Sequence, residues 1–265
     1  MISVMDYRAI NRAAWNRRTA LHLDSDFYDM AGFLSGKTSL REIELNLLGE
    51  VQGLDLLHLQ CHFGQDSLSL ARMGAQVTGV DLSDVAIREA RRLNDQLGLS
   101  AQFVCSDLYE LVLPAEFDLV FTSYGTIGWL PDLDRWAQVV ATHLRPGGRF
   151  VFVEFHPVVW MFDDDFQQIV YRYFTSDPIV EESQGSYARP DAGETLASVS
   201  WNHGLAEVVQ ALLQQGLILQ DMQEYDFSPY DVFTGGEAVG ENRYQIAKFG
   251  DKLPMIYSLV MTKPG

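Results

Sequence analysis

The chain has few cysteines, few basic residues and no long apolar segment. Its 265 residues include two cysteines, Cys61 and Cys105, which do not form a CxxC pair. This scarcity excludes a disulfide-stapled secreted module and indicates a reducing compartment, so we expect a cytoplasmic protein. No run reaches the roughly 18 apolar residues of a membrane span, and Asp6, Arg8 and Arg12 interrupt the N-terminus before a signal sequence can form. We therefore expect neither secretion nor membrane insertion.

Basic residues are outnumbered, because 19 Lys and Arg face 36 Asp and Glu, which gives a formal net charge of -17. A surface of that sign repels a phosphate backbone, so nucleic acid is not an expected partner. Hydrophobic residues make up 47% of the chain and aromatic residues 12%, which is enough for a large core. We expect a single globular domain whose partners are small molecules, cations or other proteins.

Between residues 54 and 156, short apolar runs alternate with helical patterns. The apolar runs cover residues 54–59, 76–83, 101–108, 117–125 and 149–156. This alternation is typical of an α/β, doubly wound, mostly parallel sheet with helices on both faces. Ligands of such sheets bind beyond the carboxyl ends of the strands, so the residues that end the strands are the candidates for a site.

The flanking segments differ from this core. We expect residues 1–50 to form an N-terminal helical cap and residues 201–265 to add a helix and strands to the sheet. Residues 157–200 carry eight acidic residues against two basic ones, with aromatic residues interleaved. We predict that this stretch is a lid or insertion that favours a neutral or cationic ligand, since loops carry function on a rigid scaffold. The alternative is a dimerisation arm or a solvated edge, which leaves a homodimer open.

Three of the predicted strands end in polar residues suited to a nucleotide. Asp81 ends the second strand, where a carboxylate can accept hydrogen bonds from both ribose hydroxyls. Asp107 ends the third strand, where it can accept from an adenine amine, and Ser123 and Tyr124 end the fourth. The alternative for either aspartate is a helix cap, a common use of this residue.

The motifs GVDLS, CSDL, FDLVFTSYG and LRPGGRFVFVE, taken in order, resemble those of the class I S-adenosylmethionine-dependent methyltransferases. The resemblance covers residues 54–156 and extends more weakly to the C-terminus. It implies a seven-stranded Rossmann-like sheet completed by a final hairpin, S-adenosyl-L-methionine as cofactor, and methyl transfer to a small-molecule acceptor by in-line displacement. Uncharacterised bacterial methyltransferase-like proteins are similar in the LHLQCHFGQD loop.

The first motif departs from the family pattern of an acid followed by Gly-x-Gly-x-Gly. Laid on LLHLQCHFG, the acid falls on His58 and the three glycines fall on Gln60, His62 and Gly64. Side chains therefore stand where the family brings bare backbone to the methionine part of the cofactor. The missing glycines leave open a second reading, a non-catalytic nucleotide-binding or regulatory protein on the same scaffold.

The resemblance implies a cofactor site at the strand ends, closed by the N-terminal helix. Its expected members are His58, Gln60, Cys61, His62, Phe63, Gly64, Asp81, Leu82, Asp107, Leu108, Ser123, Tyr124 and Trp15. The expected acceptor contacts are Trp129, Glu154, His156 and Trp160.

Two of these residues are predicted to be catalytic. His156 is the candidate general base, because its unperturbed pKa lies nearest neutrality, and Tyr124 is placed beside the sulfonium. The alternatives are a structural histidine at 156, a buried polar network around Glu154, and ordinary packing for Trp15 and Trp129.

Two other chemistries compete with this interpretation. In a metal site at His58-x-x-Cys61-His62, the two histidines would lie four apart across a strand-to-loop transition, where helical geometry does not set side-chain directions. We therefore assign no metal, and expect His58 to be buried and hydrogen-bonded and Cys61 to be a packing residue. A NAD-dependent oxidoreductase would share the ribose acid, but its Gly-x-Gly-x-x-Gly motif is absent.

Overall fold

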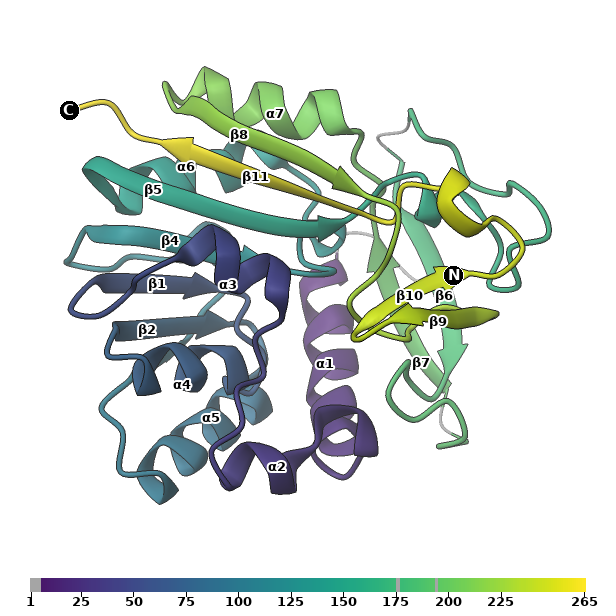
Figure 1. Ribbon diagram of the computed structural model, residues 1–265, viewed down its shortest axis with the longest axis horizontal. Coiled ribbons are helices and arrows are strands. Elements are labelled where there is room, and N and C mark those ends of the chain that lie inside the picture. The colour runs from purple at the N-terminus through teal and green to yellow at the C-terminus, as the bar shows by residue number, and fades with distance from the viewer. Residues whose placement is uncertain (1–5, 175–176, 194) are drawn as a thin grey trace.

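The computed structural model describes residues 6–174, 177–193 and 195–265, and its centre is a seven-stranded sheet (Figure 1). The strand order is β3-β2-β1-β4-β5-β11-β8. The strands are β1 (Asp55–Leu59), β2 (Gln76–Asp81), β3 (Gln102–Cys105), β4 (Phe117–Ser123), β5 (Leu144–Phe155), β8 (Ile218–Tyr225) and β11 (Ile256–Thr262). The first five are parallel, whereas β11 runs antiparallel to both its neighbours. The predicted doubly wound, mostly parallel sheet with a C-terminal hairpin is confirmed.

Helices cover both faces of the sheet. One face carries α4 (Gln65–Arg72) and α5 (Asp84–Gln96), with α3 (Glu42–Leu48) beside them, and the other carries α6 (Leu133–His143) and α7 (Leu205–Gln214). Successive side chains of β4 alternate between the two layers: Leu119 and Phe121 pack with the first, and Val120 packs with the second. Because both faces are buried, the strand reads as a continuous apolar run.

The turns that end β1 and β2 are specified locally. Gly64 is the N-cap of α4 with a φ of 82°, and a Cβ atom there would lie 2.8 Å from the Phe103 ring. The Ser83 side chain caps α5 by accepting a hydrogen bond from the Ala86 N–H. These two residues fix where the chain leaves the sheet beside the candidate site.

Helix α1 (Tyr7–Leu23) stands beside the carboxyl ends of the parallel strands (Figure 1). Its inward face repeats at intervals of four, three and four residues, through Asn11, Trp15, Arg18 and His22. The Asn11 side chain accepts from the Val199 N–H at 2.9 Å and donates to the Val199 carbonyl at 2.8 Å. The N-terminal helix is thereby attached to the segment that follows β5.

The remaining elements are short. Two antiparallel hairpins, β6 (Ile179–Gln184) with β7 (Thr195–Ser200) and β9 (Gly236–Gly240) with β10 (Arg243–Ile246), lie beyond the strand ends on the side of α1 (Figure 1). The other helical pieces are η2 (Asp26–Tyr28), α2 (Met30–Leu34), η3 (Leu108–Glu110), η4 (Ile127–Trp129), η5 (Val159–Met161) and η6 (Gly250–Lys252). Glu194, one of the acids counted in the 157–200 stretch, lies outside the described residues. Among the described helices, none combines the length and apolar character needed to cross a bilayer.

Candidate functional site

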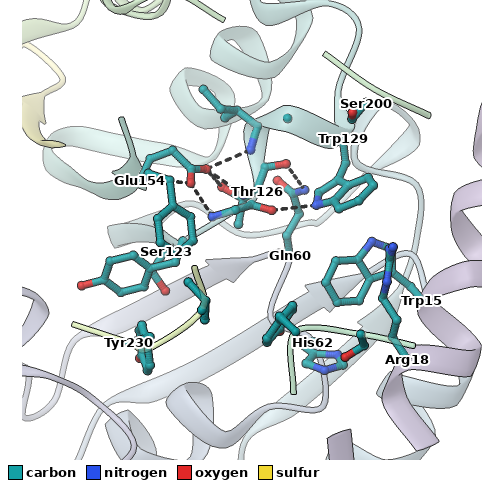
Figure 2. Close-up of a pocket in the computed structure, with 18 of the residues that line it drawn as sticks. Trp15, Arg18, Gln60, His62, Ser123, Thr126, Trp129, Glu154, Ser200 and Tyr230 are labelled. Atoms are coloured by element: carbon teal, nitrogen blue, oxygen red, sulfur yellow. Dashed lines mark hydrogen bonds between the residues drawn. The ribbon is translucent and has the colours of Figure 1, made fainter. Parts of the chain in front are cut away.

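A cavity of about 1030 Å³ lies at the carboxyl ends of β1, β2 and β4, where the strand order reverses. Helix α1, the 157–200 stretch and residues 230–234 supply its other walls. Every residue expected to contact cofactor or acceptor lines this cavity, with the exception of His156. The fold thus brings together residues separated by more than a hundred positions in the sequence (Figure 2).

The altered first turn keeps a glycine-like backbone. Gln60 has a φ of 54° and His62 a φ of 51°, the left-handed region that glycine adopts readily. The Gln60 Nε2 group donates to the carbonyl of Thr126 at 2.8 Å, while its Oε1 atom is buried without a partner. The backbone of the turn therefore keeps a conformation typical of glycine at both positions. The Gln60 side chain adds a buried acceptor that has no partner.

The His62 ring connects the turn to the cap. Its Nε2 lies 2.8 Å from His22 Nδ1, and His22 Nε2 lies 2.7 Å from the Ser186 hydroxyl. The Trp15 ring contacts His62 edge-on at a centroid distance of 5.3 Å. Burial holds the pKa of His62 well below its ordinary value and lowers that of His22 to about 3, so both rings are neutral.

Asp81 presents a carboxylate with spare acceptor capacity. Its Oδ2 accepts from the His62 N–H and its Oδ1 from the Ser83 N–H, both at 2.8 Å. Each oxygen keeps a further lone pair. Because Ser83 caps α5, Asp81 is not needed as its cap, and burial raises the pKa of Asp81 to about 6.

Asp107 is a helix cap that also faces the cavity. It caps η3 by accepting from the Tyr109 N–H at 2.8 Å, and it also lines the cavity. Its Oδ2 forms an ion pair with Arg8 of α1 at 3.2 Å. A ligand amine at this carboxylate has to share it with that guanidinium.

Arg18 is a buried cation that sequence analysis missed. Its guanidinium lies beside the rings of Trp15 and Trp129, at 5.3 and 5.2 Å from their centroids (Figure 2). The residue is 8% exposed, and one terminal nitrogen is buried without a partner. The signal that could have revealed it is the spacing of Asn11, Trp15, Arg18 and His22, which places all four on one helix face.

Glu154 fixes the loop that follows β4. Its carboxylate accepts from the backbone N–H groups of Gly125, Thr126 (2.7 Å) and Ile127 (3.2 Å), from the Thr126 hydroxyl (3.0 Å) and from its neighbour Phe155 (2.7 Å) (Figure 2). The alternative of a buried polar network is therefore confirmed, and Glu154 reaches the cavity as the anchor of this loop.

The same loop places Trp129, whose Nε1 donates to the Gly125 carbonyl at 2.7 Å and whose ring meets Trp15 at 5.5 Å. Trp160 lies at the cavity edge, 41% exposed, beside Phe155 and Phe233. Both tryptophans line the cavity, so neither is ordinary core.

His156 does not face the cavity, so its prediction as general base is wrong. Its Nε2 lies 2.9 Å from Glu224 of β8, and its Nδ1 accepts from the Val158 N–H at 3.2 Å. The reason is the C-terminal hairpin: the His156 N–H donates to Met255 beside β11, which turns the ring toward β8.

The residues of the supposed metal motif have other partners. His58 Nδ1 lies 2.8 Å from the Ser67 hydroxyl, its ring contacts Phe121, and burial lowers its pKa to about 3. Cys61 is 4% exposed and belongs to the core beside α4 and α5. The structure thus supports the structural interpretation of both residues.

Tyr124 adopts a φ of 45° and points its hydroxyl at Glu44 of α3, a residue that sequence analysis did not single out. Tyr230 and Asp66 line the cavity, whereas Glu44 lies behind its wall, and both lining residues were missed as well. None of the three ends a strand of the sheet, so the rule that selected the other candidates could not find them.

Comparison with known proteins agrees with this geometry. Residues 56–148 match the family model described as a methyltransferase domain. The chain is 29% identical over 134 residues to a ubiquinone biosynthesis O-methyltransferase of Coxiella burnetii, a match that covers 49% of this chain and 57% of the relative. It is 33% identical over 131 residues to an uncharacterised methyltransferase of Synechocystis, covering 49% of this chain and 60% of the relative. The chain therefore spans less than two thirds of the curated relatives it matches.

Among solved structures, an S-adenosylmethionine-dependent methyltransferase of Mesorhizobium loti is similar, with a TM-score of 0.58 and 24% identity. The match covers 87% of this chain and all of that one, and it concerns the fold. The strand order, the matched domain and this likeness together show that the chain has the Rossmann-like fold of these methyltransferases.

Proposed function

We propose that the chain transfers a methyl group from S-adenosyl-L-methionine to a small-molecule acceptor held in the cavity. The observation that carries the proposal is the polarity of the cavity wall. Asp81 offers free carboxylate lone pairs, Gln60 offers an unused acceptor, and Arg18 offers an unused donor, all in one cavity at the switch point of the sheet.

These residues fit the parts of the cofactor. A carboxylate with two spare lone pairs suits a ribose diol, so Asp81 is the ribose ligand of the proposal. The methionine part carries both an ammonium and a carboxylate, which call for a buried acceptor and a buried donor. Gln60 Oε1 and the free nitrogen of Arg18 are such a pair. Leaving them unpaired would be costly, since buried polar groups normally have partners.

When bound, the cofactor supplies a methyl group made electrophilic by its sulfonium. The chain then has to hold the cofactor and the acceptor in line and to exclude water, and it needs no covalent nucleophile. The rings of Trp15 and Tyr124 line the space beside the first turn, where aromatic faces favour a cation. The 157–200 stretch serves as the lid over this space, with Ser186 bonded to His22 of the cap.

The acceptor in this proposal is a neutral or cationic small molecule with a hydroxyl group. Cavity-lining carboxylates outnumber cavity-lining cations, which are Arg18, Lys37 and Arg41. The name of the Coxiella relative specifies transfer to oxygen. The two free cysteines support a reducing, cytoplasmic setting.

Titration calorimetry tests the proposal. We expect S-adenosylmethionine and S-adenosylhomocysteine each to bind at one site per chain and NADH to give no heat. A folded protein that binds neither sulfur compound would contradict the proposal, whereas NADH binding would favour an oxidoreductase. Tritium transfer from labelled S-adenosylmethionine to a panel of phenols, catechols and amines then identifies the acceptor.

A further inference from the structure

The contact between Tyr124 and Glu44 joins the cavity to a carboxyl group that the proposed cofactor site does not use. We propose that Tyr124 and Glu44 form a proton relay that removes the proton of the methyl acceptor. This inference rests on the proposed methyltransferase function. It assigns the general-base role, which His156 cannot fill, to a residue of α3.

The relay is defined by short contacts within a buried pocket. The Tyr124 hydroxyl donates to Glu44 Oε2 at 2.7 Å, and Glu44 Oε1 accepts from the Arg41 N–H at 3.1 Å. Glu44 has no exposed surface and is not part of the cavity wall, whereas Tyr124 is. The carboxylate therefore reaches the cavity through the phenol.

The chemistry balances as a two-proton transfer. A phenol oxygen has two lone pairs, so Tyr124 can accept from a ligand hydroxyl while it donates to Glu44. As the acceptor oxygen forms its bond to the methyl carbon, its own O–H bond breaks and that proton moves to Tyr124 Oη. The Tyr124 proton moves to Glu44 Oε2, and the electron pair of the broken sulfur–carbon bond stays on sulfur as a neutral thioether. Glu44 finishes protonated, and after the product leaves it returns a proton to Tyr124 as the Tyr124 hydroxyl releases its own proton to water in the cavity.

The surroundings of Glu44 suit this role. Burial, and next the charge of Asp66 on α4, raise its pKa to about 7, while the hydrogen bonds from Tyr124 and from the Arg41 N–H oppose the rise. The other titratable groups nearby are Tyr230, which meets the Tyr124 ring at 5.3 Å, and the Arg41 side chain above the Tyr230 ring. A general base is most effective when its pKa lies near the working pH.

Tyr124 cannot fill the role alone. Burial, together with the nearby Glu44, holds the pKa of its phenol well above the ordinary value. A free phenolate is therefore disfavoured, and the hydroxyl can pass a proton only if Glu44 takes one in the same step. The relay needs both residues, so removing either one should have a similar effect.

The first test reads the carboxyl group directly, without any acceptor. In protein labelled with 13C at the glutamate side-chain carboxyl, NMR titration should show a signal of Glu44 with a midpoint near 7. That signal should vanish in Glu44→Gln and persist in Glu42→Gln, the matched control, since Glu42 is an exposed residue of the same helix paired with Arg243. In Tyr124→Phe the midpoint should rise, because a donor to the carboxylate is lost. A Glu44 midpoint near that of an exposed glutamate overturns the relay.

The second test reads the transfer. With the acceptor found by the tritium panel, Glu44→Gln and Tyr124→Phe should each lower kcat by about 100- to 10,000-fold, the usual contribution of general-base catalysis. The rise of kcat with pH through about 7 should disappear in both variants. The affinity for S-adenosylhomocysteine should change less than about threefold, a range that also verifies folding.

The outcomes separate the two levels of the proposal. If wild-type protein binds no S-adenosylhomocysteine, the proposed function fails. If it binds the compound and transfers methyl groups, but the variants keep the wild-type pH profile, only the relay fails and the Tyr124–Glu44 contact is a structural tie between β4 and α3.

Discussion

The two halves of the cavity are built in different ways. The half beside β2 and β3 takes its polar groups from residues that directly end strands, and backbone N–H groups hold Asp81 in place. The half beside α3 takes Asp66 and Tyr230 from separate segments that meet only in the folded chain, and Glu44 lies behind its wall, bonded to Tyr124. The first half therefore follows from a general rule of parallel sheets, whereas the second depends on how distant segments meet, and the proposed function assigns the methyl donor to the first half and the acceptor to the second.

In the half beside β2 and β3, the largest expected effect is the loss of cofactor affinity in Asp81→Ala. A ribose diol would lose two hydrogen bonds to a carboxylate, each worth about 1.5–3 kcal/mol. The affinity for S-adenosylhomocysteine measured by calorimetry should therefore fall by at least about 100-fold. Asp81→Asn keeps the shape and should lose less. The Glu44 titration should not change in either variant, and a coupled change would show that the halves are not independent.

Glu154→Gln tests the loop that joins the halves. An amide in place of the carboxylate points N–H donors at backbone N–H groups and loses charge-assisted bonds, so the free energy of unfolding should fall by about 3 kcal/mol. Denaturant unfolding measures this change, and Glu207→Gln, at an exposed position of α7, serves as the control. Wild-type stability in Glu154→Gln would mean that the loop is held in some other way.

Glu44→Gln tests how the buried carboxyl group of Glu44, in the half beside α3, changes the free energy of unfolding with pH. The pKa of Glu44 is about 7 in the folded chain against 4.5 for an ordinary glutamate, so the folded protein holds a proton that the unfolded chain has released between these values. The contribution of this group to the free energy of unfolding falls as pH rises from about 4.5 to 7, by up to about 1.4 kcal/mol per unit.

The variant should therefore be more stable than wild type at pH 8, by about 1–3 kcal/mol, and similar to it at pH 4. Asp81, whose pKa is raised to about 6, contributes a slope of the same sign in both proteins, so the difference between them is the quantity to measure. An unchanged difference between pH 4 and pH 8 would contradict the assigned pKa of Glu44.

The smallest effect is expected from Gln60→Gly, which introduces the glycine of the first motif in the methyltransferases that the sequence resembles. Glycine relieves the left-handed backbone cost of about 1 kcal/mol but removes the bond to Thr126 and the free Oε1 acceptor. We expect near-wild-type melting temperature and a five- to tenfold weaker affinity for S-adenosylmethionine, from about 1 kcal/mol for one hydrogen bond. Tighter binding would show that Gln60 obstructs the cofactor.

The sequence predicted the sheet and the strand-end residues because local patterns determine both. Apolar runs with capped helices gave the strand positions, and Asp81 and Asp107 followed from them. His156 was misplaced because its direction depends on pairing with β11, a strand a hundred residues later in the chain. Arg18 and Glu44 were missed because buried charges carry no local signal other than helical spacing, and their partners come from distant segments.

The bonds between Asn11 and Val199 have a consequence for association between chains. Strand β7 pairs with β6 along one edge, and its other edge would expose N–H and C=O groups open to a foreign strand. One buried asparagine on α1 occupies both groups of Val199, as a neighbouring strand would. The N-terminal helix thus blocks intermolecular β-sheet formation at this edge. A chain truncated so that it lacks Asn11 should aggregate through this hairpin, even if its core remains folded.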